Sequence, residues 1–482
     1  MTYYCILEYL VRPLLKKPNL DKNDLKNYRP VSNLTYLSKL IERAILNQLT
    51  PHLNKNKCFS NFQSAYRQFH STETALCRIY NDLLLNTQNS MITLLILLDL
   101  SAAFDTIDFD LLLKDLYEGG IRGNALKLLE TYLKERFQKV SGVDSVSDPL
   151  ELSFGVPQGS VLGPVLFSLY SSKLAKIFEA HGVSYHFYAD DSQIYMPITN
   201  ITSTQSKINT IMSDIKLWML ERKLKLNEGK TEIIVINGPL KNELSVEAKN
   251  TNFINDISSS NNTRDLGLII DNKLSFRNHF NSIIKVCNFQ LRRLSSIIKY
   301  LNKNTAVTLV HAFITSRIDY CNSLFVNLPK KDLSRLQSIM NRAARLIFKL
   351  PPFTSTSPYL YELHWLPVKA RIDFKLCLLE YKCLKYKEPA YLNDLLIRYT
   401  PLSNAILRAA DDPYLLVVPR LKKHSSFGSR SFSYAGPVLY NKLPFKIKDA
   451  DTDNSFKKLL KTYLFQKSYD PTTKCMTIEY KT

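Results

Sequence analysis

The first half of the chain alternates between strand-like and helix-like spacing of apolar residues. Residues 93–98 form a continuous apolar run of the length of a buried strand, and the run ends at Asp99. Residues 109–117 then repeat apolar side chains at helical spacing and stop before Gly119, a residue type that commonly closes helices. Residues 124–137 predict a second helix. This alternation predicts an α+β fold.

Further elements follow from the same rules. Residues 202–222 carry apolar side chains at the i, i+3 and i+4 positions of a helix that packs on a sheet. Residues 185–196 predict two short strands that meet in a turn at Asp190 and Asp191. Residues 16–30 are basic and rich in turn-forming residues, and residues 258–262 form a polar loop. Helices are also expected over 36–53, with an apolar stripe of Ile41, Ala44, Ile45 and Leu49, and over 72–85 and 160–178, and strands over 223–226, 231–236 and 266–270.

The second half of the chain turns helical and basic. Residues 281–350 contain 12 Lys and Arg against 2 Asp, a local balance of +10, on helices that keep an apolar stripe. Such a face is either solvated or grips a phosphate backbone, and its charge density favours the second reading, with Arg292 and Arg293 as contacts. The expected stripe is Ile283, Ile284, Cys287, Leu291 and Leu294. Residues 351–482 mix helical and turn-rich segments and indicate no chemistry.

Composition sets the class of protein. The 482 residues, 45% of them apolar, are enough for about three lobes. No run reaches the ~18 apolar residues of a membrane-spanning helix, and residues 1–10 lack a basic leading segment and contain Glu8. With neither signal peptide nor membrane span, an intracellular protein of the nucleus or cytoplasm is expected. The eight cysteines show no zinc-ligand spacing, so we expect them to be reduced and structural.

Net charge points to a partner. Lys and Arg number 64 against 43 Asp and Glu, a formal charge of +21. Strongly basic intracellular proteins usually bind nucleic acid. Composition alone leaves a merely basic soluble protein as an equal alternative.

Three carboxylates could carry chemistry. Asp99 ends the predicted buried strand, and Asp190 and Asp191 stand at the predicted hairpin tip. A sheet that sets these strands side by side would cluster them, and paired Mg²⁺ ions prefer such oxygen ligands in phosphoryl transfer. An Asp-Asp pair alone is weak support, because hairpin turns favour Asp for backbone reasons.

Three ordered strings give this pair a context. They read LDLSAAFD at 98–105, GVPQGSVLGP at 155–164 and YADD at 188–191, with NYRPVSN at 27–33 and QSAYR at 63–67 upstream and LNEGKT at 226–231 downstream. Together they resemble the reverse transcriptases of non-LTR (LINE-type, jockey-like) retrotransposons. The resemblance is strong over about residues 16–271, and one departure is Ala65, where the family usually has Gly.

The resemblance implies a right-hand polymerase with fingers, palm and thumb and a mostly helical C-terminal region. The implied divisions are fingers over 1–90, palm with interleaved fingers elements over 91–262, the end of the palm and a basic helical thumb over 263–350, and a region of unknown role over 351–482. It also implies that Asp99 and Asp190 ligate two Mg²⁺ ions, or Mn²⁺, with Asp191 as a weaker ligand or electrostatic support.

The remaining roles come from the same resemblance. Lys230 would protonate the departing pyrophosphate, although a solvated lysine is the alternative. Phe104 would lie under the sugar and exclude a 2′ hydroxyl, although in isolation a core aromatic is the better interpretation. The backbone between Asp99 and Phe104 would lie against the triphosphate. The other implied contacts are Gln158 and Gly159 with the nucleotide, Arg67 with the triphosphate, and Arg29 with template or phosphate.

The leading interpretation is an RNA-directed DNA polymerase that uses an RNA template, a DNA primer and deoxynucleoside triphosphates. An RNA-synthesising palm polymerase would share the carboxylates, but Phe104 argues against it. A truncated retroelement remnant that only binds nucleic acid is the alternative from another class. An endonuclease would come from another chain or from a missing N-terminal part.

Overall fold

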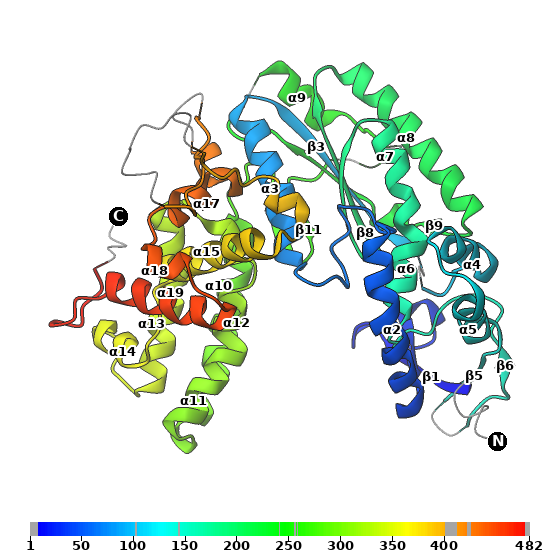
Figure 1. Cartoon of the computed structure of the whole chain (residues 1–482). Helices are drawn as coiled ribbons and strands as arrows, with labels where there is room; N and C mark the ends of the chain where they lie inside the picture. Colours follow the sequence, from blue (N-terminus) through cyan, green and yellow to red (C-terminus); the bar gives the residue numbers. More distant parts are fainter. Residues whose placement is uncertain are drawn as a thin grey trace.

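The computed structural model describes residues 8–101, 104–142, 145–240, 242–254, 257, 259–400, 412–421 and 426–477. Most of the leading segment 1–10, and Ala102 and Ala103 of the expected triphosphate-facing backbone, lie outside the described residues. Strands and helices are mixed through the first half and helices dominate the second, which confirms the α+β prediction (Figure 1).

A four-stranded antiparallel sheet forms the centre of the molecule. Its order is β10 (Glu232–Ile236), β3 (Ile92–Leu98), β8 (Asp191–Ile198) and β7 (Ser184–Tyr188). Alternate residues of β3 enter two separate cores, Leu94 and Ile96 on one face and Leu95 on the other. Because both faces are covered, the strand reads as one apolar run.

Each face of the sheet has its own cover. One face packs against helices of the first half, whose apolar side chains form a core with Leu94, Ile194 and Val235. The other face packs against α3, which lies between the sheet and the C-terminal helices (Figure 1). The helices of this half are α2 (Tyr36–Lys55), α3 (Thr72–Gln88), α4 (Phe109–Glu118), α5 (Gly123–Lys134), α6 (Gly163–Ser171), α7 (Ala175–Ala180), α8 (Ile201–Glu221) and α9 (Glu243–Asn250).

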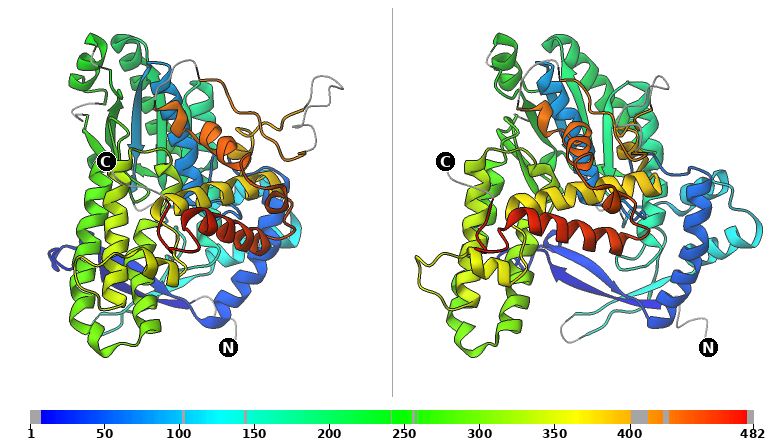
Figure 2. Two further views of the ribbon diagram at one scale, coloured as in Figure 1. Left: turned by 90° about the vertical axis from the view of Figure 1, so that its left-hand side faces the viewer. Right: turned by 60° about the vertical axis from the view of Figure 1, so that its left-hand side comes forward.

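A second four-stranded sheet was not predicted. It has the order β2 (Tyr28–Asn33), β1 (Glu8–Leu15), β5 (Phe137–Val140) and β6 (Leu150–Glu151), and its first two strands extend across the lower part of the molecule (Figure 2). The helix expected over 124–137 ends at Lys134, because Phe137 already pairs with β1. Two-stranded pairs are formed by β4 (Leu100–Ser101) with β9 (Lys225–Leu226) and by β11 (Asn262–Asp265) with β12 (Leu268–Asp271).

The predicted apolar stripe of α2 is correct at Ile45 and Leu49, which pack in the core, but wrong at Ile41 and Ala44. Ile41 is exposed, and so is Ala44, whereas Glu42 is 1% exposed. The buried side is built on Glu42, Leu49 and Leu53, because the Glu42 carboxylate has polar partners inside the protein. A pattern based on apolar residues could not detect a buried acid.

The second half is helical. The expected stripe on α10 is confirmed: Ile283, Cys287, Leu291 and Leu294 are buried and Ile284 is partly buried. The C-terminal helices α15 and α19 lie side by side and share the core of α3 and α10 (Figure 2). The helices are α10 (Arg277–Ile297), α11 (Lys303–Val310), α12 (Ser316–Ile318), α13 (Lys330–Ile347), α14 (Ser357–Glu362), α15 (Val368–Tyr386), α16 (Ala390–Asn393), α17 (Phe432–Tyr440), α18 (Phe445–Lys448) and α19 (Asp453–Ser468). Among the described residues, no helix combines the length and apolar character needed to cross a bilayer.

Candidate active site

The registers of the central sheet align three charged residues at one edge. The pairing of Leu98 with Ser192 brings Asp99 level with Asp191 on β8. On the other side of β3, the pairing with β10 brings Lys230 level with Asp99. The sequence prediction that neighbouring strands gather these carboxylates is therefore correct in its topology.

Asp190 occupies a tight turn between β7 and β8. Tyr188 pairs with Asp191, so that only Ala189 and Asp190 connect the strands. Ala189 has a φ of 58°, in the left-handed region that costs a non-glycine residue about 1 to 3 kcal/mol. Such strain persists where surrounding contacts fix the backbone. Here the pairing of β7 with β8 fixes it and places Asp190 at the hairpin tip.

Asp99 is held from the β9–β10 side. Its Oδ2 accepts hydrogen bonds from Lys230 Nζ at 3.0 Å and from Asn227 Nδ2 at 3.1 Å. The backbone N–H of Asn227 also donates to the Asp99 carbonyl at 2.9 Å. One side of the Asp99 carboxylate is thus fixed before any ligand binds.

Restricted hydration and neighbouring negative charge raise the proton affinity of Asp190 and Asp191. Restricted hydration raises the pKa of Asp190, and the Asp99 charge raises it further, while Lys230 and Arg29 oppose the shift. Restricted hydration and the charges of Asp190 and Asp99 together raise the pKa of Asp191 to about 6. The edge therefore carries negative charge that neighbouring cations offset only in part.

This donor set suits a divalent cation. Within the described ranges, no three His, Cys, Asp or Glu side chains converge closely enough to hold a metal ion as they stand. Asp99, Asp190 and Asp191 nevertheless supply hard oxygen ligands, and a cation between them would relieve the repulsion that contributes to the raised pKa values of Asp190 and Asp191.

A cavity of about 900 Å³ opens beside the carboxylates. Asp190 and Asp105 contribute acidic groups to it, and five basic side chains surround them. Such a mixture suits a ligand that carries both phosphates and metal ions. The lining residues that matter here are Lys16, Lys26, Arg29, Tyr66, Phe104, Asp105, Gln158, Gly159, Asp190, Lys225, Asn227 and Lys230.

The turn at 155–164 is closely packed against β2. The backbone N–H of Ser32 donates to the Gln158 carbonyl at 2.8 Å, and a Cβ on Gly159 would lie 2.8 Å from the Ser32 carbonyl oxygen. Gly159 also has a φ of 122°, so glycine is required there. The Gln158 amide donates to both Asp105 carboxylate oxygens, at 3.1 and 2.9 Å.

Phe104 belongs to the core and to the cavity at once. It is half-buried, and its ring packs on Phe167 with centroids 4.9 Å apart. It also lines the cavity beside Asp105 and Gln158. Both interpretations drawn from the sequence therefore have a structural basis.

The Arg67 side chain points to backbone carbonyls of its own loop, not into the cavity as a triphosphate contact would require. Its Nη1 donates to the backbone carbonyls of Ser60 and Gln63 at 3.2 and 3.1 Å. Partial burial lowers the pKa of the Arg67 guanidinium. Its neighbour Tyr66 faces the cavity instead, so the loop is in the expected place while the arginine is turned to its own backbone.

Glu42 anchors the turn at 155–164 from the opposite side. One carboxylate oxygen accepts the backbone N–H groups of Val161 at 2.5 Å and Leu162 at 3.2 Å. The other faces Arg136 Nη2 at 3.4 Å, and both side chains are almost fully buried. The sequence analysis missed this support because Glu42 lies outside the recognised strings.

The two arginines of α10 lie away from the carboxylates. Both Arg292 and Arg293 are exposed, and Arg293 lies over the Phe289 ring at 5.7 Å. Arg292 lines a hollow of about 540 Å³ between α10 and α13 together with Arg342, Arg345 and Lys349. This concentrates basic side chains on the expected helical face.

Two residues of the cavity, Tyr66 and Asn227, had no role predicted from the sequence. Tyr66 and Asn227 lie inside strings that were recognised, at 63–67 and 226–231. Their positions beside Asp190 and Asp99 could have been inferred from those strings, whereas the lysines at 16, 26 and 225 had no such marker.

Comparison with known proteins adds independent information. A family model described as "Reverse transcriptase (RNA-dependent DNA polymerase)" matches residues 15–270. The "Probable RNA-directed DNA polymerase from transposon BS" of Drosophila melanogaster is 25% identical over 375 residues, which cover 75% of this chain and 40% of that protein. The "RNA-directed DNA polymerase from mobile element jockey" of the same species is 25% identical, over 71% of this chain and 38% of that protein. The chain thus spans about two fifths of the length of these relatives.

Among solved structures, the chain is similar to "Structure of apo telomerase from Candida Tropicalis". That match has 13% identity and a TM-score of 0.43, and covers 80% of this chain and 68% of the other.

Proposed function

The chain belongs to the reverse transcriptase (RNA-dependent DNA polymerase) family, and on this premise we propose that it copies an RNA template into DNA from a primer end, using deoxynucleoside triphosphates. Its similarity to the jockey and transposon BS polymerases confirms the predicted kinship with non-LTR elements. The right-hand polymerase fold predicted from the sequence is the fold of this family.

The observation that carries the proposal is the sheet edge. Asp99, Asp190 and Asp191 meet there beside a cavity whose other charged groups are mostly basic. These carboxylates would hold two Mg²⁺ or Mn²⁺ ions, which activate the primer 3′ oxygen and neutralise the pyrophosphate when bound. Arg29 and the cavity lysines would bind the triphosphate and template phosphates.

Lys230 would act as a proton donor at this edge. Its ammonium lies 3.0 Å from Asp99 Oδ2, and the side chain is otherwise largely exposed. We expect it to transfer its hydrogen bonds from Asp99 to the departing pyrophosphate and then to protonate it.

The opposite wall of the cavity would receive the nucleotide. Phe104 would lie against the sugar, and the Gln158–Gly159 turn would contact the nucleotide through its backbone. Arg67 would reach the triphosphate after giving up its bonds to Ser60 and Gln63. The basic face of α10, with Arg292 and Arg293, would hold the duplex through its phosphates. The supply of a primer end by a separate nuclease stays a prediction.

Primer extension on an RNA template with Mg²⁺ tests the proposal. Wild-type protein is expected to extend the primer. Asp99→Asn or Asp190→Asn should lower the extension rate more than about 100-fold, which exceeds the loss caused by removing a residue that only supports a metal ligand. Both variants should bind duplex as well as wild type, because the metals serve chemistry and the basic surface serves affinity.

Asp110→Asn is the matched control, since Asp110 is an exposed residue that pairs with Lys134. Chelation of divalent ions should stop extension, and Mn²⁺ should restore it. Retained extension by either carboxylate variant would sink the assignment of the edge. Duplex binding without extension by wild type would instead identify a nucleic-acid-binding remnant.

A further inference from the structure

Residues 60–71, the part of the α2–α3 loop that leads into α3, contain two strained residues. Tyr66 has a φ of 59° and Phe69 a φ of 64°, and neither is glycine. Each left-handed residue of this kind costs about 1 to 3 kcal/mol, so it persists only where the surrounding structure fixes it. The contacts around this loop therefore decide where Tyr66 and Arg67 lie.

One side of the loop is held by the central sheet. The backbone N–H of Ser64 donates to the Phe187 carbonyl at 3.0 Å, and the Phe187 N–H donates to the Phe62 carbonyl at 2.9 Å. The Ser64 hydroxyl lies 2.7 Å from His186 Nε2 on β7. This side joins the loop to the strand that leads to Asp190.

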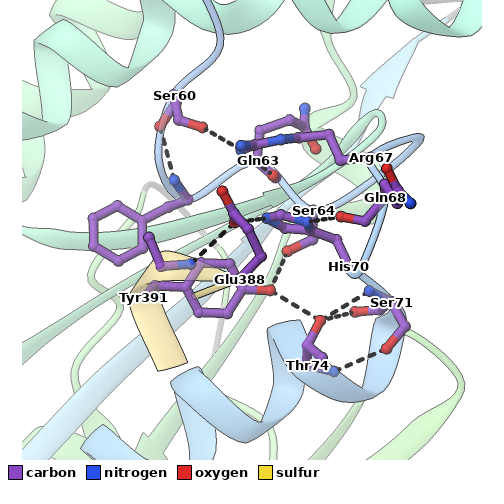
Figure 3. A network of polar contacts seen from close by, with 12 residues as sticks. Ser60, Gln63, Ser64, Arg67, Gln68, His70, Ser71, Thr74, Glu388 and Tyr391 are labelled. Carbon is purple, nitrogen blue, oxygen red and sulfur yellow. Dashed lines mark hydrogen bonds and ion pairs between the residues drawn. The ribbon is translucent and has the colours of Figure 1, made fainter. Parts of the chain in front are cut away.

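The other side is held by the C-terminal region, as Figure 3 shows. The Tyr391 hydroxyl on α16 lies 2.7 Å from Ser64 Oγ and donates to Thr74 Oγ1 at 2.9 Å. Tyr391 is 2% exposed. Its hydroxyl thus joins residues that are separated from it by more than 300 positions in the sequence.

The hydrogen bonds that link His186, Ser64, Tyr391 and Thr74 can each be assigned a direction. Thr74 Oγ1 donates to the Ser71 carbonyl and therefore accepts from Tyr391. Tyr391 has only one hydroxyl proton, so it accepts from Ser64, and Ser64 in turn accepts from His186 Nε2–H. His186 Nδ1 then carries no proton, which agrees with its lack of a partner among the described residues. Burial lowers the pKa of His186 to about 3, so the ring stays neutral.

Other residues of the segment 386–391, which contains Tyr391, also contact the loop. The Tyr386 ring stacks on Phe69 with centroids 4.3 Å apart and an interplanar angle of 19°. Glu388 lies 3.8 Å from His70 (Figure 3). The Tyr391 carbonyl also accepts a hydrogen bond from Arg78 of α3 at 2.9 Å. Residues 386–391 therefore cover the strained part of the loop.

The loop continues directly into the cavity. Tyr66, two residues after Ser64, lines it together with Asp190. The Asp190 charge contributes to the raised pKa of the Tyr66 phenol, which confirms their proximity.

We propose that Tyr391 is a positioning residue for nucleotide binding: through Ser64 it fixes the loop that carries Tyr66 and Arg67 beside Asp190. The proposal rests on the proposed polymerase function. It gives the C-terminal region a role, as one wall of the support for the nucleotide site.

Tyr391→Phe tests the proposal with little change of shape. Ser64 loses its acceptor and Thr74 loses one donor, so the loop relaxes. The KM for deoxynucleotides should rise about 3- to 10-fold, the range for loss of one hydrogen bond, while kcat changes less than about 2-fold. Ser64→Ala should raise KM similarly, and the double variant should be no worse than either single one, because both remove the same link.

Tyr381→Phe is the matched control. Its hydroxyl is also in the C-terminal region and has two partners, the Ala450 carbonyl at 2.6 Å and Lys385 Nζ at 2.9 Å, but it does not touch the loop. It should leave KM unchanged. A purely structural role of Tyr391 would instead lower the thermal midpoint and the active fraction without changing KM, and that result overturns the proposal.

Hydrogen exchange separates failure of this proposal from failure of the proposed function. Amides of residues 60–71 should exchange faster in Tyr391→Phe than in wild type or Tyr381→Phe, and this readout requires no catalysis. If wild type extends no primer, the proposed function fails, and unchanged exchange would overturn the link to the loop as well. Faster exchange with unchanged KM in an active enzyme would overturn the positioning role.

Discussion

Two sets of carboxylates in the molecule have opposite surroundings. At the sheet edge, restricted hydration and neighbouring like charges raise the pKa values of Asp190 and Asp191 beside an open cavity. Beneath the 155–164 turn, Glu42 is buried against Arg136 and accepts two backbone N–H groups. The Glu42 carboxylate, which supports the fold, thus has its counter-charge and hydrogen-bond donors within the protein. The carboxylates at the sheet edge, where we expect the chemistry, keep negative charge that a bound cation could neutralise.

The largest stability effect expected from this contrast is at Glu42. Glu42→Gln leaves the buried Arg136 guanidinium without its counter-charge, and loss of one partner of a buried pair costs about 3 to 5 kcal/mol. Asp191→Asn removes one of several like charges and should leave stability unchanged or higher. Denaturant unfolding in the presence of a chelator compares the two.

The double variant Glu42→Gln/Arg136→Met is the control, since removing both charges should recover part of the loss. Equal losses at Glu42 and Asp191 would erase the distinction between the two sets.

Phe104 connects the two kinds of surroundings, because it packs on Phe167 and lines the cavity. If it excludes the 2′ hydroxyl, Phe104→Val should admit ribonucleotides and keep some deoxynucleotide activity. If it serves only the core, Phe104→Ala should lower the free energy of unfolding, by up to about 3 to 5 kcal/mol for a fully buried ring. Incorporation of ribonucleotides and of deoxynucleotides should then be lost together.

Measuring the thermal midpoint and the ratio of ribo- to deoxynucleotide incorporation in both variants separates these outcomes. An unchanged ratio in a folded, active variant would remove the gate assignment.

Glu380 on α15 is a third case, a buried acid without a hydrogen-bond partner among the described residues. It is 0% exposed, and neither carboxylate oxygen has a hydrogen-bond partner within the described ranges. The titratable groups that its charge affects are Cys377 and Cys383 on α15 and Tyr440 on α17, none of them a cation. Burial therefore raises the pKa of Glu380 well above its usual 4.5.

The raised pKa gives stability a definite pH dependence. Above about pH 4.5 the unfolded chain releases this proton while the native protein keeps it, so stability falls as pH rises until the native pKa is passed. Glu380→Gln should match wild type near pH 4 and become more stable toward pH 8, by about 1.4 kcal/mol per unit of pKa shift. Parallel curves for the two proteins would contradict a buried, protonated Glu380.

The smallest effect is expected on the exposed face of α10, at Arg292 and Arg293. Arg292→Ala together with Arg293→Ala should weaken duplex binding and reduce the slope of log affinity against log salt by up to about 2. Fluorescence anisotropy across a salt series measures this, and processivity should fall in parallel. An unchanged slope would mean that this face is merely solvated.

The placement of the carboxylates at the sheet edge could be predicted from sequence because they lie in strings with strong local patterns. The apolar run before Asp99 defines β3, and the hairpin signal defines the turn at Asp190. The pairing of β1 with β5 could not be predicted, since it joins Tyr9 to Gln138 with no local signal on either strand. The triphosphate contact of Arg67 stays a prediction, and the present orientation of this side chain depends on backbone carbonyls that no local pattern reveals.

Tyr391 illustrates the same limit. Its partner Ser64 lies 327 positions away, and a tyrosine in a short helix has no distinguishing neighbours. Contacts between distant segments follow from how two cores meet, which periodicity along one segment does not encode.

The shared core has a practical consequence for dividing this protein. One face of the central sheet, with Leu95, Tyr195 and Ile234, packs in the same apolar cluster as α10 and α15. A fragment that stops at residue 270, where the family match ends, would keep α3 but expose to water the side of this cluster that the C-terminal helices cover, and would be prone to aggregate. The unit recognised by comparison is therefore smaller than the unit that folds, and expression boundaries should include the C-terminal helices.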